Sequence, residues 1–199
     1  SVIEWCINNS QRYNISVISM SLGIDCDGSP NGCFNSASLN PQGTSCDSYY
    51  PYFTNLIEDA VAKNISVTVA TGNDDNNTHI SFPSCITGVT RVTASNKLDA
   101  MASYSNRNSL VRIISPGTDI NSTMIQFPYG GLGCSNGIGY CLMDGTSMAT
   151  PHVAGSIALI KQYLSLTSQS KTPAQIENAL DSSGTLIYDS SSDRNYSRI

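Results

Sequence analysis

Residues 145–155 read GTSMATPHVAG, and this stretch determines how the rest of the chain is interpreted. Its small and apolar residues predict a buried helix that starts at Ser147 and runs to about Leu164. Pro151 is expected within the first helical turns, where backbone N–H groups lack partners in any case. Ser147 would then lie beside free N–H groups and the positive end of the helix dipole. Such groups can stabilise negative charge on a substrate oxygen, which makes Ser147 a candidate functional residue.

All eleven positions resemble the nucleophile segment of the subtilases, the subtilisin-like serine proteases. The resemblance implies that Ser147 attacks a peptide carbonyl and that His152 is a structural part of the helix. A separation of five residues is also a poor helical offset for two side chains that must meet. One alternative is an ordinary helix start that is rich in small residues. Another, an α/β-hydrolase, is disfavoured because Gly-x-Ser-x-Gly is absent: Ala149 stands at its last position.

Asn73 is the second candidate catalytic residue. It ends the segment Ala-Thr-Gly-Asn, which follows the apolar residues 65–70. The resemblance implies that its side-chain amide donates to the oxyanion that forms during peptide hydrolysis. The plain alternative is an asparagine in a turn.

The resemblance also extends to substrate binding. The family's S-L-G segment adds a substrate backbone as an extra strand, and the segment before Asn73 forms one wall of the pocket for the residue preceding the cut bond. A serine at the pocket floor would leave it small and uncharged, which favours bulky apolar or aromatic substrate side chains. The residues implied by this likeness are Ser21, Leu22, Gly23, Ala70, Thr71, Gly72 and Ser81.

Helix-like and strand-like segments alternate along the chain, which predicts an α/β fold with a mostly parallel sheet flanked by helices. Residues 24–50 are expected to form an insertion loop, and residues 181–199 a surface tail. Thr172, Pro173 and Gln175 predict a capped helix start. Helices are expected at 2–13, 53–61, 147–164 and 173–180, and strands at 17–22, 65–70, 89–94 and around 113–114.

The histidine and aspartate of a serine-protease triad cannot be assigned in this sequence. The triad needs a histidine to accept the serine proton and an acid to orient that histidine. In subtilases both precede the S-L-G strand, in motifs close to D-[ST]-G and H-G-T. The chain has two histidines, His79 and His152, and neither lies in such a motif. We therefore expect the triad Asp and His upstream of Ser1, with residues 1–199 as the C-terminal portion of a single subtilisin-like peptidase domain.

Two functional hypotheses follow from this incomplete triad. The first is a serine endopeptidase that forms an acyl-enzyme on Ser147, with Asn73 in the oxyanion hole. The alternative is a catalytically inactive, subtilase-like module that binds peptides. The presence of both Ser147 and Asn73 favours the first hypothesis, because a chain without catalysis has no physical need for either.

Composition limits the partners. The net charge of -5 argues against nucleic acid, and no apolar run approaches the ~18 residues that span a bilayer. Seven scattered cysteines favour disulfides and an extracellular or secretory location, with buried reduced cysteines as the alternative. The chain opens on Ser1 without a signal-peptide pattern, so we expect a mature form or a fragment. The family resemblance allows a structural calcium ion, but no acidic segment has the spacing of a defined calcium loop.

Overall fold

The computed structural model describes residues 1–24, 44–123 and 139–199. The helices in these ranges are α1 (Val2–Tyr13), the short 3-10 helix η2 (Asp47–Tyr49), α3 (Pro51–Ala62), α4 (Thr146–Leu166) and α5 (Pro173–Ser183). The strands are β1 (Val17–Met20), β2 (Ser66–Ala70), β3 (Thr90–Ser95), β4 (Ile113–Pro116), β5 (Ile120–Thr123), β6 (Tyr140–Met143), β7 (Thr185–Asp189) and β8 (Arg194–Arg198).

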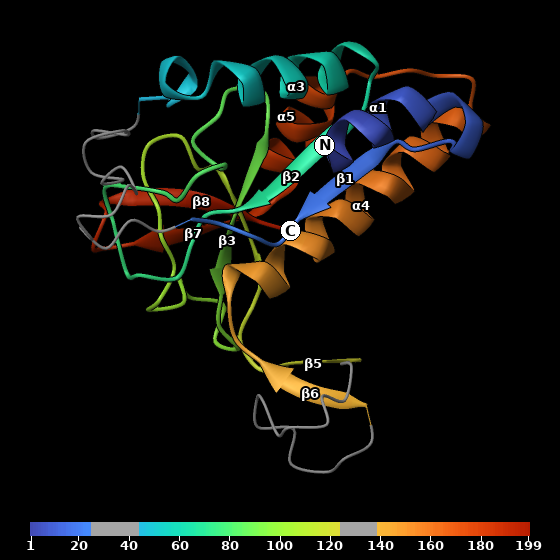
Figure 1. The fold of residues 1–199 in the computed structure, drawn as a ribbon. Coiled ribbons are helices and arrows are strands. Elements are labelled where there is room, and N and C mark those ends of the chain that lie inside the picture. Colours follow the sequence, from blue (N-terminus) through green and yellow to red (C-terminus); the bar gives the residue numbers. More distant parts are fainter. Residues whose placement is uncertain (25–43, 124–138) are drawn as a thin grey trace.

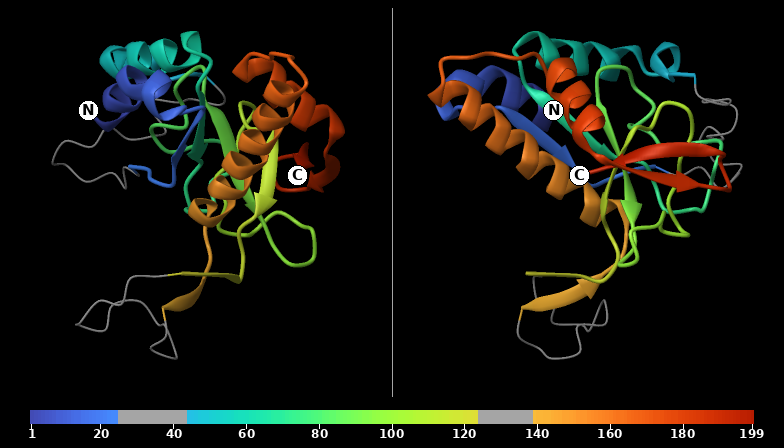
Figure 2. Two further views of the ribbon diagram at one scale, coloured as in Figure 1. Left: turned by 90° about the vertical axis from the view of Figure 1, so that its right-hand side faces the viewer. Right: turned by 180° about the vertical axis from the view of Figure 1, so that it is seen from behind.

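A six-stranded sheet forms the centre of the molecule, in the order β1-β2-β3-β4-β8-β7. Neighbouring strands from β1 to β8 run parallel, whereas β7 is antiparallel to β8. Helices α1 and α3 cover one face of the sheet, and α4 and α5 cover the other (Figures 1 and 2). Strands β5 and β6 form a separate antiparallel ribbon that projects from the body (Figure 1). The predicted α/β fold with a mostly parallel, helix-flanked sheet is confirmed.

Two clusters of buried apolar side chains hold the layers together. The first includes Ile7 of α1, Ile57 of α3 and Val67 of β2. The second includes Val153 of α4 and Ile176 of α5, which pack against β3 and β4. Strand β2 is buried at every position, as expected for a parallel strand with helices on both sides.

The start of α5 follows from local sequence. The Gln175 N–H donates to Thr172 Oγ1 at 3.3 Å, and the Thr172 N–H donates to Gln175 Oε1 at 3.0 Å. This reciprocal pair is the predicted capping box, and Pro173 follows at the first helical position, where no N–H is needed. The helix continues to Ser183 rather than ending near Leu180.

The prediction of a surface tail at 181–199 is wrong. Residues 185–189 and 194–198 form the hairpin β7–β8, and β8 joins the main sheet beside β4. Tyr196 is 1% exposed, so it anchors the hairpin in the core. The hydroxyl of Ser197 donates to Asp181 O at 2.6 Å and to the Asp181 carboxylate at 2.7 Å. The polar composition that suggested a tail is therefore satisfied by hydrogen bonds within a folded element.

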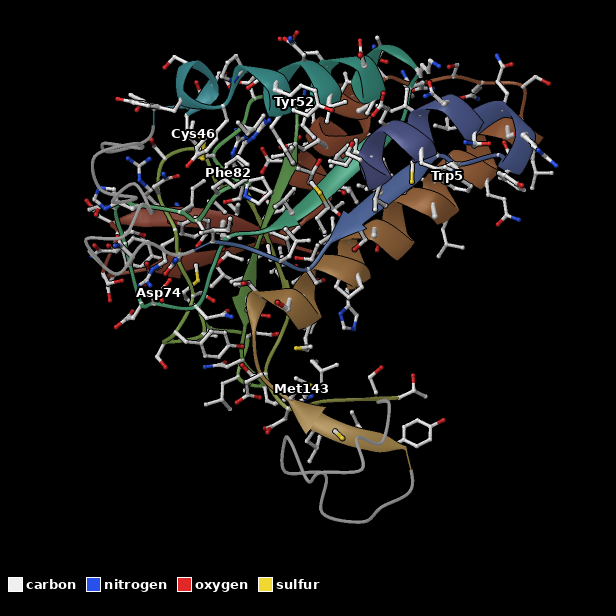
Figure 3. The ribbon with its side chains drawn as sticks, viewed as in Figure 1. Trp5, Cys46, Tyr52, Asp74, Phe82 and Met143 are labelled. Carbon is white, nitrogen blue, oxygen red and sulfur yellow. A yellow bond between two sulfur atoms is a disulfide. The ribbon has the colours of Figure 1, made fainter. Side chains whose placement is uncertain are left out.

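The predicted insertion loop at 24–50 lies mainly outside the described residues. Its final part contains η2 and a disulfide between Cys46 and Cys85, across 39 positions of sequence. Figure 3 labels Cys46 of this disulfide and Phe82. The Phe82 ring packs against Tyr50 and Phe53, with ring centroids 4.1 and 5.0 Å apart. Cys141 is also disulfide-bonded, and Cys6 is a free thiol. Cys26, Cys33 and Cys134 lie outside the described residues.

Removing the Cys46–Cys85 bond should destabilise the protein. Replacing both cysteines by alanine is expected to lower the free energy of unfolding by about 3–4 kcal/mol, because the bond closes a long loop in the unfolded chain. Urea unfolding measures the change. Cys6→Ala is the matched control and should lower the free energy of unfolding by about 1 kcal/mol or less, since Cys6 is a free thiol. Equal unfolding midpoints for the double variant and the wild type would contradict this prediction.

Candidate active site

The candidate residues gather where the parallel strands end. Residues 21–23 directly follow β1, and residues 71–73 directly follow β2. Helix α4 begins at the same edge, because the Gly145 N–H donates to the carbonyl of Gly117, just after β4, at 2.9 Å. Open α/β folds bind their ligands at this carboxyl edge of the sheet. The topology therefore brings together segments that are more than 120 positions apart in sequence.

Ser147 is the second residue of α4 and is partly exposed. Its hydroxyl donates to Ser21 O at 3.4 Å. Its backbone N–H belongs to the first helical turn, where donors have no helical acceptor. Within the described ranges that N–H has no acceptor elsewhere either. The hydroxyl is therefore accompanied by a free backbone donor from the same residue.

Pro151 has a different role from the one expected. It is the sixth residue of α4. The prediction that it lies among the first residues of the helix, whose N–H groups have no helical acceptor, is therefore wrong. In a regular helix its N–H would donate to the carbonyl of Ser147, four residues earlier, and proline has no N–H. The hydroxyl of Ser21 donates to that freed carbonyl at 2.7 Å. Ser21 thus ties the end of β1 to the first turn of α4.

The side chain of Asn73 is held by its oxygen. Asn73 Oδ1 accepts from the Thr146 N–H at 2.8 Å and from Thr146 Oγ1 at 3.0 Å. A backbone N–H can only donate, so the amide oxygen must face Thr146 and the amide nitrogen is left for another acceptor. A Cβ added to Gly145 would lie 3.4 Å from Asn73 Nδ2 and 3.6 Å from Ser147 N. Two N–H donors therefore flank the space that the missing side chain of Gly145 leaves open.

The predicted pocket residues are also close to one another. Ser81 is buried, and its N–H donates to the carbonyl of Thr71 at 2.9 Å. A Cβ added to Gly23 would lie 3.2 Å from the Cβ of Ser81. Ala70 is buried at the end of β2, whereas Leu22 is exposed. The segments that follow β1 and β2 thus meet at Ser81.

Asn106 is a site residue that the sequence did not reveal. Its side chain is buried and donates to Ser81 Oγ at 3.4 Å and to Asp74 Oδ2 at 2.8 Å. Its Oδ1 accepts from the N–H groups of Asp74 and Asn76, at 2.9 and 3.1 Å. These bonds span 25 to 32 positions of sequence, and an asparagine in a polar loop carries no local signal of them.

Tyr104 also supports the start of α4 and was not predicted. Its hydroxyl donates to Gly117 O at 2.8 Å and accepts from the Gly145 N–H at 3.1 Å. Burial raises the pKa of Tyr104, so the hydroxyl keeps its proton as a donor at neutral pH.

Gly72 is expected to tolerate no side chain. Its φ of +105° is a conformation that L side chains rarely adopt, and an added Cβ would collide with Ser81 Oγ and the Asn106 amide. Gly72→Ala should therefore lower the free energy of unfolding by about 2–4 kcal/mol in urea titration. Gly155→Ala is the matched control, because a Cβ on this helical glycine meets nothing within 4 Å. The free energy of unfolding of Gly155→Ala should be unchanged or up to about 1 kcal/mol higher than that of the wild type. If Gly72→Ala proves as stable as Gly155→Ala, Gly72 does not require its glycine.

Neither histidine contacts Ser147. His152 is exposed, and its Nδ1 donates to the carbonyl of Met148 in its own helix at 2.8 Å. His79 Nδ1 is 2.6 Å from Thr78 Oγ1 and 3.3 Å from Asn76 Oδ1. Neither histidine is therefore placed to accept a proton from Ser147. The ranges that the structure describes contain no group of three His, Cys, Asp or Glu side chains that could hold a metal ion.

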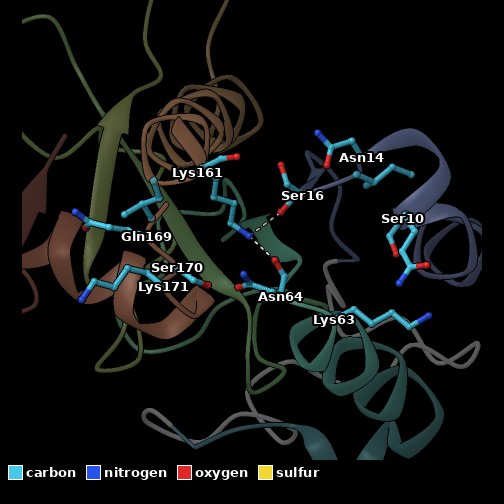
Figure 4. Close-up of a pocket in the computed structure, with 13 residues that line it drawn as sticks. Ser10, Asn14, Ser16, Lys63, Asn64, Lys161, Gln169, Ser170 and Lys171 are labelled. Atoms are coloured by element: carbon cyan, nitrogen blue, oxygen red, sulfur yellow. Dashed lines mark hydrogen bonds between the residues drawn. The ribbon is translucent and has the colours of Figure 1, made fainter. Parts of the chain in front are cut away.

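A cavity of about 370 Å³ lies at the opposite edge of the sheet, where β1 and β2 begin (Figure 4). The ammonium group of Lys161 reaches into it and donates to Ser16 O at 2.9 Å and Asn64 O at 2.5 Å. Burial lowers the pKa of Lys161 to about 8. Because this group fastens α4 to the starts of two strands, the cavity belongs to the scaffold and not to the Ser147 site.

Comparison with known proteins identifies the class that this fold and site define. The model of the subtilase family matches residues 2–196. The chain therefore belongs to the subtilase family. It is 31% identical over 188 residues to subtilisin of Bacillus pumilus, and 37% identical over 126 residues to an extracellular protease of Xanthomonas campestris pv. campestris. These alignments cover 93% and 63% of this chain, respectively.

Solved structures show the same likeness. A cold-adapted subtilisin-like serine proteinase superposes with a TM-score of 0.65 at 26% identity, over 98% of this chain and 59% of that one. The chain spans 54% of the Bacillus subtilisin and 20% of the Xanthomonas protease. It thus corresponds to part of the length of each relative.

Proposed function

We propose that this chain supplies the nucleophile and the oxyanion hole of a serine endopeptidase. Ser147 Oγ adds to the carbonyl carbon of a peptide bond while its proton passes to a base. The negative charge forms on the carbonyl oxygen, where Asn73 Nδ2 and the Ser147 N–H donate to it. The intermediate then expels the amine, which takes the proton from the base and leaves an ester on Ser147. Water hydrolyses that ester by the same proton transfers.

The observation that carries this proposal is the pair of donors beside Gly145. Asn73 Nδ2 and Ser147 N lie 3.4 and 3.6 Å from the position of a Cβ added to Gly145, two residues before the proposed nucleophile. Both are held before any substrate arrives, Asn73 by Thr146 and Ser147 by its place in α4. Donors that are fixed in advance stabilise developing charge without rearrangement, which is the property an oxyanion hole requires.

The triad Asp and His come, in this proposal, from a segment upstream of Ser1 that belongs to the same domain. The surface beside β1 supports this assignment. Among the described strands, β1 has a neighbour on one side only. A groove of about 660 Å³ along α4 exposes Leu159 and Leu166, at 69% and 79%. An unpaired strand edge next to exposed leucines favours a partner that adds a strand and covers the helix.

The proposed substrate is an extended polypeptide. The substrate backbone would lie along residues 21–23, where Gly23 leaves room for it. The substrate side chain just before the cut bond would enter the space between residues 70–72 and Ser81. The serine at that position is small and uncharged, which favours bulky apolar or aromatic side chains there. The buried hydrogen bond from Asn106 to Ser81 supports a fixed pocket floor.

An extracellular or secretory location is part of the proposal. The Cys46–Cys85 disulfide favours an oxidising compartment. Relatives occur on both sides of the membrane: the Xanthomonas protease is extracellular, and an intracellular serine protease of Paenibacillus polymyxa is 39% identical over 116 residues. No helix in the described ranges is long and apolar enough to cross a bilayer.

Reconstitution tests the proposed function. Residues 1–199 alone should hydrolyse casein hardly at all, because loss of the base costs subtilisin, a relative, about 10⁶ in kcat. Adding the upstream segment with its D-[ST]-G and H-G-T motifs should restore hydrolysis. Full activity of residues 1–199 alone would contradict the assignment of the base. A reconstituted pair that binds casein without cleaving it would overturn the peptidase function in favour of a peptide-binding module.

A further inference from the structure

Arg107 is a buried cation outside the set of residues proposed for catalysis. Its side chain is 5% exposed, and every nitrogen of its guanidinium group has a partner. Nε donates to Asp189 Oδ2 at 2.9 Å, Nη1 donates to Ser105 O at 2.6 Å and to Asp75 Oδ1 at 3.1 Å, and Nη2 donates to Ser191 Oγ. Because removing a charge from water is expensive, a fully paired buried arginine fixes all of its partners.

These partners come from two distant parts of the chain. Asp75 lies in the loop that follows Asn73, whereas Asp189 and Ser191 lie where β7 turns into β8. The Arg107 N–H also donates to Asn76 O at 2.7 Å. A second bridge runs directly between the same two segments, from Asn77 Nδ2 to Ser191 O at 2.9 Å. The tip of the C-terminal hairpin is thus fastened to the loop over residues 75–77.

That loop continues directly from Asn73. Its early residues are fixed from the opposite side, where Thr146 holds the Asn73 amide oxygen and Asn106 accepts from the Asp74 N–H. Residues 75–77 belong to no strand or helix. The Asp75 N–H donates to Tyr104 O at 2.8 Å and the Asn76 N–H to Asn106 Oδ1 at 3.1 Å, and Arg107 and the hairpin supply further bonds to this segment. A small displacement of a group that must meet a transition state can cost a large part of the rate.

We propose that Arg107 is a positioning residue for the oxyanion hole, which couples the C-terminal hairpin to the loop that carries Asn73. This inference rests on the proposed function of Asn73. It assigns a role in catalysis to the hairpin β7–β8, which contains none of the proposed catalytic residues. In this role the hairpin holds residues 75–77 of the loop from the side opposite Thr146.

The charge state of Asp189 agrees with this role. Burial by itself raises the pKa of Asp189, but hydrogen bonds from Ser192, Arg107 and Ser191 and the Arg107 charge outweigh it and lower the pKa to about 2. The carboxylate therefore remains ionised across neutral pH, and the ion pair with Arg107 stays intact there.

The test compares Arg107→Met, Arg107→Lys and a matched control in the full-length protein that carries this chain. Arg112→Met is the control, because the half-exposed Arg112 side chain pairs with Glu177, Asn178 and Asp181 of α5 and not with residues 75–77. Arg107→Met should lower kcat about tenfold with KM within about twofold, and Arg107→Lys should restore part of the loss. Arg112→Met should leave both constants unchanged. A loss confined to KM, or equal losses for Arg107→Met and Arg112→Met, would overturn the proposal.

Hydrogen–deuterium exchange separates this inference from the proposed function. We expect residues 73–77 to exchange faster in Arg107→Met and at the wild-type rate in Arg112→Met. That result would show that Arg107 holds the loop, even if Ser147 proves not to be the nucleophile. Unchanged exchange there overturns it. Asn77→Ala serves where Arg107→Met does not fold, since Asn77 is exposed and its removal deletes the second bridge. It should raise exchange in the same segment, and unchanged exchange in this variant too would overturn the inference.

Discussion

Ser147→Ala should lower the kcat of peptide hydrolysis by about 10⁶, the loss known for the corresponding change in subtilisin, a member of the same family. The physical reason is that the Ser147 hydroxyl is the group proposed to form the ester, and alanine has no hydroxyl to replace it. The measurement is the hydrolysis of a fluorogenic peptide by the protein that carries this chain together with the proposed Asp and His segment. Substrate affinity should change little, because the missing interaction forms only during the reaction.

Ser156→Ala provides the control for that experiment. Ser156 lies in the same helix, and its hydroxyl donates to the carbonyl of His152 at 3.0 Å, away from the donors at Gly145. The variant should keep kcat within about twofold of the wild type. If Ser147→Ala retains activity comparable to Ser156→Ala, Ser147 is not the nucleophile.

Asn73→Asp is expected to lower kcat by about 10²–10³ with KM nearly unchanged, the magnitude known for the equivalent donor of subtilisin. Aspartate is the informative replacement. Its carboxylate still accepts from the Thr146 N–H and hydroxyl, so the side chain keeps its place, but no N–H remains to donate to the oxyanion. The kinetic constants and the melting temperature are measured together.

Asn73→Ala is the companion variant, because it removes the donor and also the contact with Thr146. It should lose a similar factor in kcat and, in addition, some thermal stability. An Asn73→Asp protein with wild-type kcat would show that the Asn73 amide does not donate to the transition state.

Much of the fold follows from the sequence because the deciding signals are local. The capping box from Thr172 to Gln175 spans four neighbouring positions, and the burial of β2 follows from a short β-branched run. The start of α4 follows from small residues around Ser147. The site segments at 21–23, 70–73 and 81 follow from the resemblance to the subtilases, and the structure brings them together at the edge where β1 and β2 end.

Long-range pairing accounts for what the sequence did not reveal. The hairpin β7–β8 has a polar sequence, and only the neighbouring β4 and the core pocket around Tyr196 make it a pair of strands. The effect of Pro151 on the Ser147 carbonyl depends on Ser21, 126 positions away. Asn106 and Arg107 are ordinary loop residues until the fold places Asp74 and Asp189 against them.

The most direct test of the central claim is covalent labelling of the active-site serine. The protein that carries this chain and its proposed Asp and His segment is treated with a fluorophosphonate, and mass spectrometry locates the adduct. We predict stoichiometric modification of Ser147 in step with loss of peptide hydrolysis, and no modification in Ser147→Ala. An inactivated protein that carries the adduct on another residue, or hydrolysis that continues with Ser147 fully modified, would contradict the account.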